Sequence, residues 1–176
     1  MYKYWVHTDR SSAYEHPTCQ VYAYEPFPES FRLLDENIRL NATSKVVAFS
    51  VAVGAQSEKM TLFTTGAAVQ HTTTNASRPT DAISVQGLCL DDVLGVNAIE
   101  ACDFLKMDCE GGEFNILLNA SEATLQKIKN ICLEYHDGVT RFSHIDLVNY
   151  LQKKGFQVRT APNPVHGHLG FLYAFR

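Results

Sequence analysis

The chain lacks a long hydrophobic run, and this absence argues against two classes of protein. None of its apolar stretches approaches the roughly 20 residues that a helix needs to cross a bilayer. Residues 1–7 also lack the extended apolar core of a secretion signal. We therefore expect a cytoplasmic protein whose partners do not include a membrane.

An excess of positive charge and paired cysteines are missing too. The formal net charge is −4, the pI is about 5.9 and the basic residues are scattered, so no nucleic-acid partner is expected. The five cysteines are odd in number and show no C-x-x-C spacing, which argues against a disulfide framework. We expect reduced thiols that pack in the interior.

What is present is an ordinary globular composition, with 45% hydrophobic and 19% charged residues, which fits one domain over residues 1–176. The hydrophobic pattern predicts strands over 19–24, 45–53, 59–64, 83–90, 104–108, 130–135, 156–160 and 169–175. It predicts helices over 28–41, 91–94, 112–119, after 121 and over 143–154. The long polar segment 65–82 is typical of a lid or binding loop, and equally of disorder.

Strands that alternate with helices indicate an α/β fold with a mostly parallel sheet. Right-handed crossovers then place the carboxyl ends of the strands along one edge. The last two predicted strands have a connection too short for a helix, so they should pair antiparallel. Polar residues at or after strand ends are expected to converge at the shared edge: Glu25, Asp108, Glu110, Glu134 and His136.

A short apolar run stops abruptly in acids and glycines in the stretch DFLKMDCEGGE. A buried strand followed by paired glycines is how an open α/β sheet ends at its ligand crevice. Asp108, Glu110 and Glu113 are therefore candidate site residues. Gly111 and Gly112 allow the backbone to approach a ligand or adopt a positive φ. A capped turn with surface acids is an equally good interpretation of such a motif taken alone.

An ordered series of motifs resembles the FkbM family of S-adenosylmethionine-dependent methyltransferases. The series comprises VYAYEP at 21–26, LDD at 90–92, LKMDCEGGE at 105–113 and CLEYH at 132–136. With the closing hairpin, the resemblance covers about residues 20–175. It implies a Rossmann-like class I methyltransferase sheet, S-adenosyl-L-methionine as cofactor, and methyl transfer to a hydroxyl of a sugar, glycan or small metabolite.

The resemblance also suggests roles for individual residues. In such enzymes the acid after the second strand hydrogen-bonds the cofactor ribose, which corresponds to Glu25, followed here by Pro26. A carboxylate suits this role because it accepts two hydroxyl donors side by side. A solvated turn acid before proline is the alternative. Asp108 belongs to the implied site, where it orients substrate, acts as a base or contacts the cofactor.

His136 is a candidate general base, because the pKa of an imidazole lies near the working pH. Glu134 or Asp108 would orient its ring. A hydrogen-bonded turn residue is the alternative interpretation. The same acids and imidazole would suit a divalent cation, but their spacing matches no closed metal motif, so we predict no metal.

The sequence departs from the family upstream of Val21. The resemblance predicts a first strand and a glycine-rich turn there, yet residues 7–17, HTDRSSAYEHP, contain no glycine. We expect an N-terminally truncated chain whose first strand is missing or replaced by residues 2–6. A missing central strand would expose an unpaired edge and favour a homodimer. The second hypothesis is therefore an inactive fragment or noncatalytic binding domain that no longer holds the cofactor.

Overall fold

The structure, a computed structural model, describes residues 4–7, 19–42, 44–64, 71–72, 81–109 and 111–176. Its strands are β1 (Tyr4–His7), β2 (Val21–Tyr24), β3 (Val46–Phe49), β4 (Ala52–Gly54), β5 (Lys59–Thr64), β6 (His71–Thr72), β7 (Asp81–Cys89), β8 (Phe104–Met107), β9 (Asn130–His136), β10 (Gln157–Pro162) and β11 (Leu169–Phe175). Its helices are α1 (Pro28–Leu40), α2 (Leu90–Val96), α3 (Glu113–Asn119), α4 (Glu122–Lys127) and α5 (His144–Lys153).

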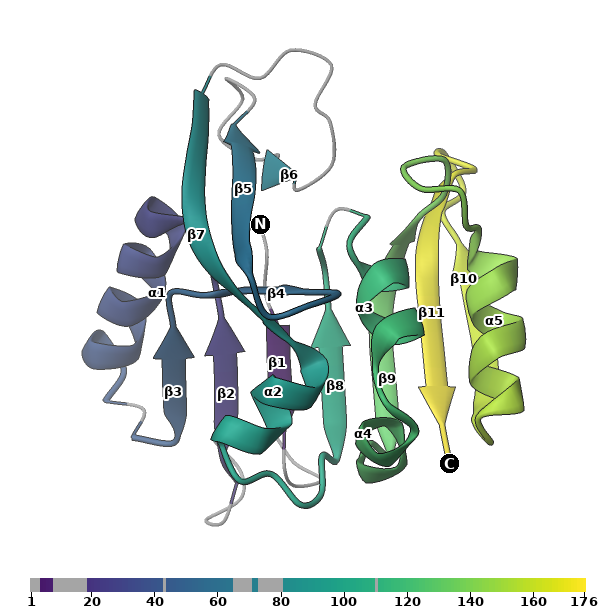
Figure 1. Cartoon of the computed structure of the whole chain (residues 1–176), viewed down its shortest axis with the longest axis horizontal. Helices are drawn as coiled ribbons and strands as arrows, with labels where there is room; N and C mark the ends of the chain where they lie inside the picture. The colour runs from purple at the N-terminus through teal and green to yellow at the C-terminus, as the bar shows by residue number, and fades with distance from the viewer. Residues whose placement is uncertain (1–3, 8–18, 43, 65–70, 73–80, 110) are drawn as a thin grey trace.

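The main sheet has seven strands in the order β10-β11-β9-β8-β1-β2-β3 (Figure 1). Strands β2, β3, β8, β9 and β10 run in one direction, and β1 and β11 run against them. The expected α/β fold with a mostly parallel sheet and an antiparallel closing hairpin is therefore confirmed. The carboxyl ends of β2, β8 and β9 meet at the upper edge in Figure 1, which we call the rim.

Strand β1 fills the centre of the main sheet, between β2 and β8. Trp5 pairs with Ala23 on one side and with Lys106 on the other, antiparallel in both cases. The expected first strand is thus replaced by this segment. Because β1 runs against its neighbours, Tyr4 lies at the rim opposite Tyr24, so β1 begins at the edge where β2 and β8 end.

The prediction of one strand over residues 45–53 is wrong. The chain leaves the main sheet after β3, and β4 pairs in parallel with β7 in a second, four-stranded sheet, order β4-β7-β5-β6. A valine-rich run favours extended backbone but does not specify its pairing partner. The predicted loop over 65–82 falls mostly outside the described residues; its described parts, 71–72 and 81–82, belong to β6 and β7.

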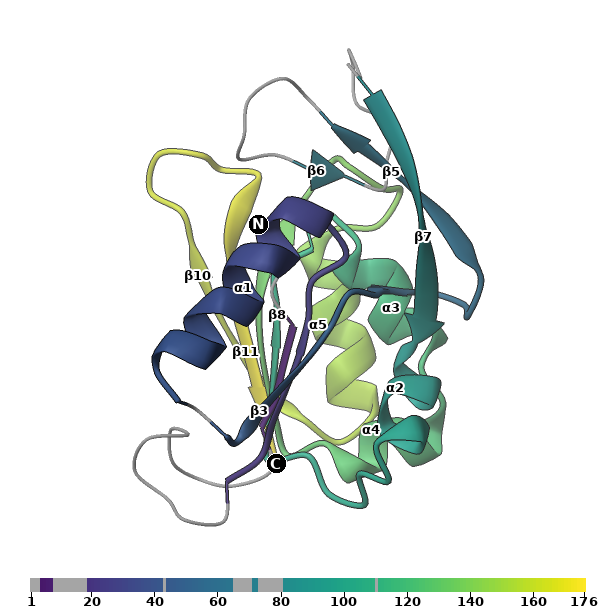
Figure 2. The same ribbon diagram turned by 90° about the vertical axis from the view of Figure 1, so that its left-hand side faces the viewer.

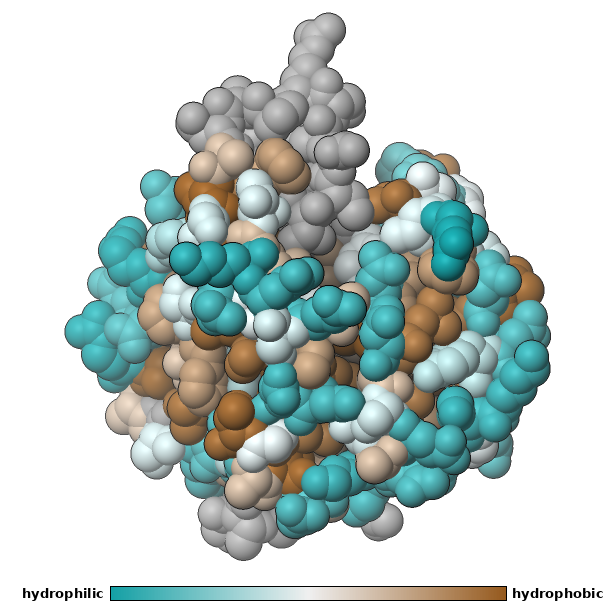
Figure 3. Space-filling model, in the orientation of Figure 1, coloured by the Kyte–Doolittle hydropathy of each residue, from teal (hydrophilic) through white to brown (hydrophobic). Residues whose placement is uncertain are grey.

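The hydrophobic core lies between the main sheet and helices α2 to α5. Leu105, Leu133 and Leu172 are at most 1% exposed and pack with Leu147 and Leu151 of α5 in one cluster. Helix α1 covers the opposite face of the sheet, as Figure 2 shows. Figure 3 views the molecule from the side of α2 and shows many hydrophilic residues on its surface, with hydrophobic patches between them. Within the described part of the chain, no helix has the length and apolar character needed to cross a membrane.

Helix α5 begins at the predicted cap. The backbone N–H and hydroxyl of Ser143 both donate to Asp146 Oδ2, at 2.8 and 2.9 Å. These hydrogen bonds favour the ionised carboxylate and lower the pKa of Asp146 below its ordinary value of 3.8. The ionised acid therefore fixes the start of α5, whose Leu147 and Leu151 belong to the core.

We expect Asp146→Ala to lower the Tm at about pH 7 and to lower it less at about pH 2.5. The pKa of this carboxyl is depressed in the folded state. Its stabilising contribution is therefore present above the unfolded-state pKa and is lost as the pH falls through the folded-state pKa. Thermal melts followed by circular dichroism measure both effects. Equal losses of Tm at the two pH values would contradict this role, and Asp146→Asn is the isosteric comparison.

Candidate functional site

Three of the predicted site residues lie along the rim. Glu25 follows β2, Asp108 follows β8 and His136 ends β9, and these three strands share one direction. Because β1 separates β2 from β8, Glu25 and Asp108 are two strand spacings apart, about 10 Å. That separation lets one ligand of nucleoside size contact both strand ends.

Glu25 is a buried acid and not the solvated turn residue of the alternative interpretation. The residue is 2% exposed, and Pro26 beside it is buried. Its Oε1 accepts the backbone N–H of Phe27 at 2.9 Å, just before α1, and its own N–H donates to Phe49 O at 3.0 Å. The carboxylate is thereby held at the end of β2, where it faces the start of a helix.

Glu113 organises the turn between β8 and α3. It is 0% exposed, Oε1 accepts the N–H of Cys109 at 2.6 Å, and Oε2 accepts the N–H of Gly111 at 3.0 Å. We expected Glu113 to bind substrate or to shape the site, and its carboxylate is closed off and bonded to its own turn. It therefore shapes the backbone that follows Asp108. Glu110, in the same turn, lies outside the described residues.

Glycine suits the two positions 111 and 112 of this turn for different structural reasons. Gly111 has a φ of +101°, and a Cβ there would lie 2.5 Å from Val139 Cγ1, so the turn packs directly against the loop that follows β9. Gly112 has an ordinary helical backbone, and a Cβ there would lie 3.2 Å from Cys109 Cβ. Glycine at 111 thus brings two neighbouring segments of the rim into contact.

His136 lies beside a carboxylate other than the two that were expected to orient it. Its Nδ1 lies 3.6 Å from Glu113 Oε1, within ion-pair range when the ring is protonated, and the residue is 9% exposed. Glu134 or Asp108 had been expected beside this ring. The signal available was positional: α3 begins after the short turn that follows β8, so an acid in its first turn can reach the end of the neighbouring strand β9.

Asp108 and Glu134 meet on the sheet face opposite α2 to α5. Met107 pairs with Leu133, so the next residues lie side by side, and Glu134 pairs in turn with Phe171. Lys106 Nζ lies 3.8 Å from Asp108 Oδ2. A hollow of about 250 Å³ is lined by Lys106, Met107, Asp108, Cys132, Leu133, Glu134 and Phe171. Two carboxylates, one ammonium group and an aromatic ring thus surround a space large enough for a small ligand.

The hollow contains one thiol, Cys132, whose surroundings disfavour the thiolate. Burial raises the pKa of Cys132 above its ordinary value of 9.0, and the charge of Lys106 opposes this shift only in part. The other four cysteines lie outside the hollow, and three of them, Cys19, Cys102 and Cys109, are buried. Among the described residues, no group of three or more His, Cys, Asp or Glu side chains is arranged to hold a metal ion.

A family model and a solved structure are both similar to most of this chain. The family model described as Methyltransferase FkbM domain matches residues 6–158. A solved structure of methyltransferase FkbM from Methylobacillus flagellatus KT superposes with a TM-score of 0.60 at 20% identity, over 89% of this chain and 36% of that one. This likeness shows the fold.

Two curated proteins are also similar. Methyltransferase 1 of Beauveria bassiana is 24% identical over 164 residues, which is 82% of this chain and 65% of that protein. AMB antimetabolite synthetase AmbE of Pseudomonas aeruginosa is 38% identical over 72 residues, which is 39% of this chain and 3% of that protein. The chain therefore spans less than two thirds of the length of each relative.

We expect Gly111→Ala to destabilise the fold more than Gly138→Ala. Both glycines have a positive φ, +101° and +84°, which costs another residue about 1–2 kcal/mol. Of the two, Gly111 alone meets a neighbour at its new methyl, so displacement of Val139 adds roughly 1–3 kcal/mol. Urea unfolding followed by circular dichroism measures the difference. Equal destabilisation would contradict the contact between the turn and the loop after β9.

Proposed function

The chain belongs to the FkbM methyltransferase family, and we propose that it transfers a methyl group from S-adenosyl-L-methionine to a hydroxyl of a sugar, glycan or small metabolite. The family match over residues 6–158 supports the reaction class. The observation that carries the proposal is the position of Glu25 and Asp108 at the carboxyl ends of two strands that share one edge of the sheet.

Glu25 is the proposed ligand of the cofactor ribose. Its carboxylate is buried at the end of β2, next to Pro26, and one oxygen is held by the N–H of Phe27. A carboxylate fixed in this way accepts hydroxyl donors with little loss of side-chain freedom. In α/β folds ligands bind outside the carboxyl ends of strands, which is where this side chain lies.

Asp108 and Glu134 are proposed to bind the acceptor. S-adenosylmethionine supplies a methyl group on a positively charged sulfur, and its transfer to a hydroxyl releases one proton. The two carboxylates accept hydrogen bonds from acceptor hydroxyls, and Lys106, 3.8 Å from Asp108, donates to an acceptor oxygen. His136 lies beside Glu113 at the end of β9, and its proposed role is to position this strand end.

One observation favours a second candidate, a noncatalytic binding domain. At the centre of the rim β1 begins where a parallel strand would end, so among the described residues β1 supplies no turn at this edge to cradle a cofactor. Backbone N–H groups in such a turn are a main source of affinity for nucleotide-like ligands. Binding of S-adenosylhomocysteine separates the two candidates.

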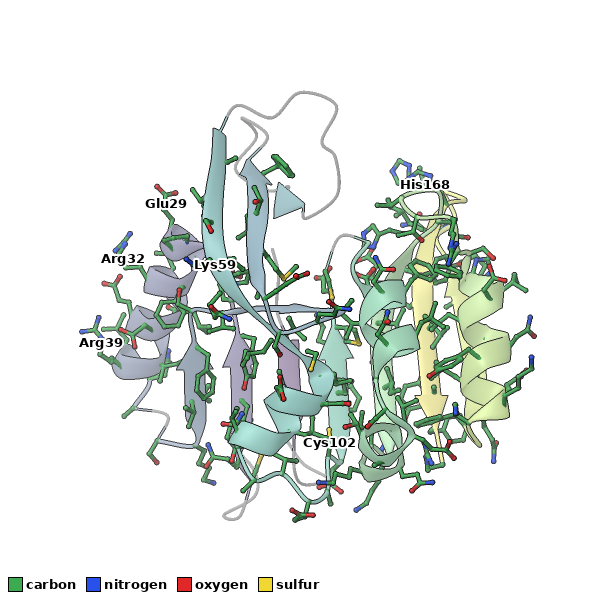
Figure 4. All side chains as sticks on the ribbon, in the orientation of Figure 1. Glu29, Arg32, Arg39, Lys59, Cys102 and His168 are labelled. Atoms are coloured by element: carbon green, nitrogen blue, oxygen red, sulfur yellow. The ribbon has the colours of Figure 1, made fainter. Side chains whose placement is uncertain are left out.

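We expect isothermal titration to detect S-adenosylhomocysteine binding that Glu25→Ala weakens by roughly 10- to 100-fold, because hydrogen bonds to a charged acceptor are lost. Glu25→Gln keeps an oxygen for the N–H of Phe27 and guards against a local folding effect. Glu29→Ala is the matched control, since Glu29 points away from the sheet in Figure 4. Absence of heat with the unsubstituted protein at millimolar ligand would support the noncatalytic domain.

We expect Asp108→Asn to lower kcat for methyl transfer by at least about tenfold, because the amide keeps the shape but loses the charge that orients the acceptor. The assay uses cofactor labelled in the methyl group with a panel of methyl glycosides and simple polyols. Glu100→Gln serves as control, because this side chain is 86% exposed. Unchanged turnover in Asp108→Asn would remove Asp108 from the mechanism.

A further inference from the structure

A second pairing of histidine and carboxylate lies directly beyond β9. Asp137 follows His136, and its two carboxylate oxygens both contact His144 at the start of α5. Oδ1 accepts the backbone N–H of His144 at 2.6 Å, and Oδ2 lies 2.5 Å from its Nδ1. The imidazole also stacks on Tyr135, with ring centroids 4.3 Å apart and planes 16° apart. One edge and one face of the ring are thereby fixed.

These contacts determine the tautomer and the orientation of the His144 imidazole. A carboxylate at 2.5 Å holds the proton of a neutral imidazole on Nδ1, which leaves the lone pair on Nε2. A base whose tautomer and orientation are fixed by a carboxylate is the arrangement that acid–base catalysis requires. Tyr135 does not compete for the proton of a substrate, because burial, reinforced by the charge of Asp137, raises the pKa of its phenol.

Accessibility distinguishes this pair from the one formed by His136. The side chains of His136 and Glu113 are 11% and 0% exposed, whereas those of His144 and Asp137 are 24% and 21% exposed. The first pair is enclosed by protein. The second is partly exposed to solvent.

The pair also lies at the rim already described. Its loop contains Val139, which touches Gly111 in the turn after Asp108. The N–H of Asp137 donates to His168 O at 2.8 Å, and Figure 4 shows His168 at the tip of the closing hairpin, at this same edge. Three segments therefore surround the pair: the turn after β8, the loop after β9 and the hairpin between β10 and β11.

A purely structural role accounts for only part of this geometry. Asp137 joins its loop to α5 through the backbone N–H of residue 144, a contact that any residue except proline would make. The second contact, to Nδ1, exists only because residue 144 is histidine. The imidazole is thus an addition to a connection that is complete without it.

We propose that Asp137 and His144 form the general base of the methyl transfer, in which Nε2 of His144 takes the proton from a hydroxyl of an acceptor that reaches from Asp108 over the end of β9 to the helix side of the sheet. This inference rests on the proposed function. The hydroxyl oxygen forms a bond to the methyl carbon while the carbon–sulfur bond breaks, and the electron pair of that bond stays on sulfur. The hydroxyl proton moves to Nε2, and the Asp137 carboxylate stabilises the imidazolium. His144 is the catalytic residue, and Asp137 is a positioning residue.

The test compares His144→Ala with His168→Ala, a surface histidine of the same rim. The same labelled cofactor and acceptor panel are used for both variants and for the unsubstituted protein. We expect His144→Ala to lower kcat by about 100-fold or more, with S-adenosylhomocysteine affinity unchanged, and free imidazole to restore part of the activity. His168→Ala should behave as the unsubstituted protein, and Asp137→Asn should lower kcat without loss of cofactor affinity.

The possible failures are distinguishable. If the unsubstituted protein transfers methyl groups and His144→Ala retains kcat within about threefold, the inference is wrong and the proposed function stands. If the unsubstituted protein neither binds S-adenosylhomocysteine nor transfers methyl groups, both are wrong. A measurement without any acceptor is long-range proton–nitrogen NMR of the histidines. An Nε2–H tautomer of His144 in the neutral protein would overturn the proposal, and an Nδ1–H tautomer that Asp137→Asn abolishes would support it.

Discussion

The rim of this protein depends on one buried carboxylate. Glu113 is fully enclosed, and its two oxygens hold the backbone of the turn that leads from β8 into its own helix. The same group lies beside His136 at the end of the next strand. A buried charge is tolerated only when hydrogen bonds replace its water. The turn after Asp108 supplies them, so the path of the backbone and the burial of the Glu113 carboxylate depend on each other.

Most helices and strands could be predicted from the sequence, because their hydrophobic periodicity is local. Helix α5, with Ser143 and Asp146 at its start, and the closing hairpin agree closely with expectation. The split of residues 45–53 between two sheets could not be predicted. The direction of β1 could not be predicted either. The split and the direction of β1 both depend on which distant strand provides a free hydrogen-bonding edge. The pattern of side chains along the sequence does not indicate that strand.

The residues that lie together at one edge of the sheet could be predicted from the sequence, but the side-chain contacts between them could not. Parallel strands and right-handed crossovers bring Glu25, Asp108 and His136 to one edge whatever the details of packing. The sequence signal for the partner of His136 was only positional and did not distinguish a buried acid, because an acid in the first turn of a helix is stable on the surface through the helix dipole alone. Its burial follows from the packing of α3 over the core. Glu134 likewise faces the hollow beside Asp108, because its position in β9 fixes the face of the sheet.

The pairing of Tyr4 with Tyr24 has a practical meaning for handling the protein. The polypeptide enters the sheet at the rim, whereas β11 ends at the opposite edge, where Phe175 pairs with Asn130 (Figure 1). An affinity tag or fluorescent label joined ahead of Tyr4 starts beside the edge where the cofactor is proposed to bind and competes for the space above it. A label attached beyond β11 emerges at the opposite edge and leaves that space open, which makes this side of the sheet the better place for immobilisation.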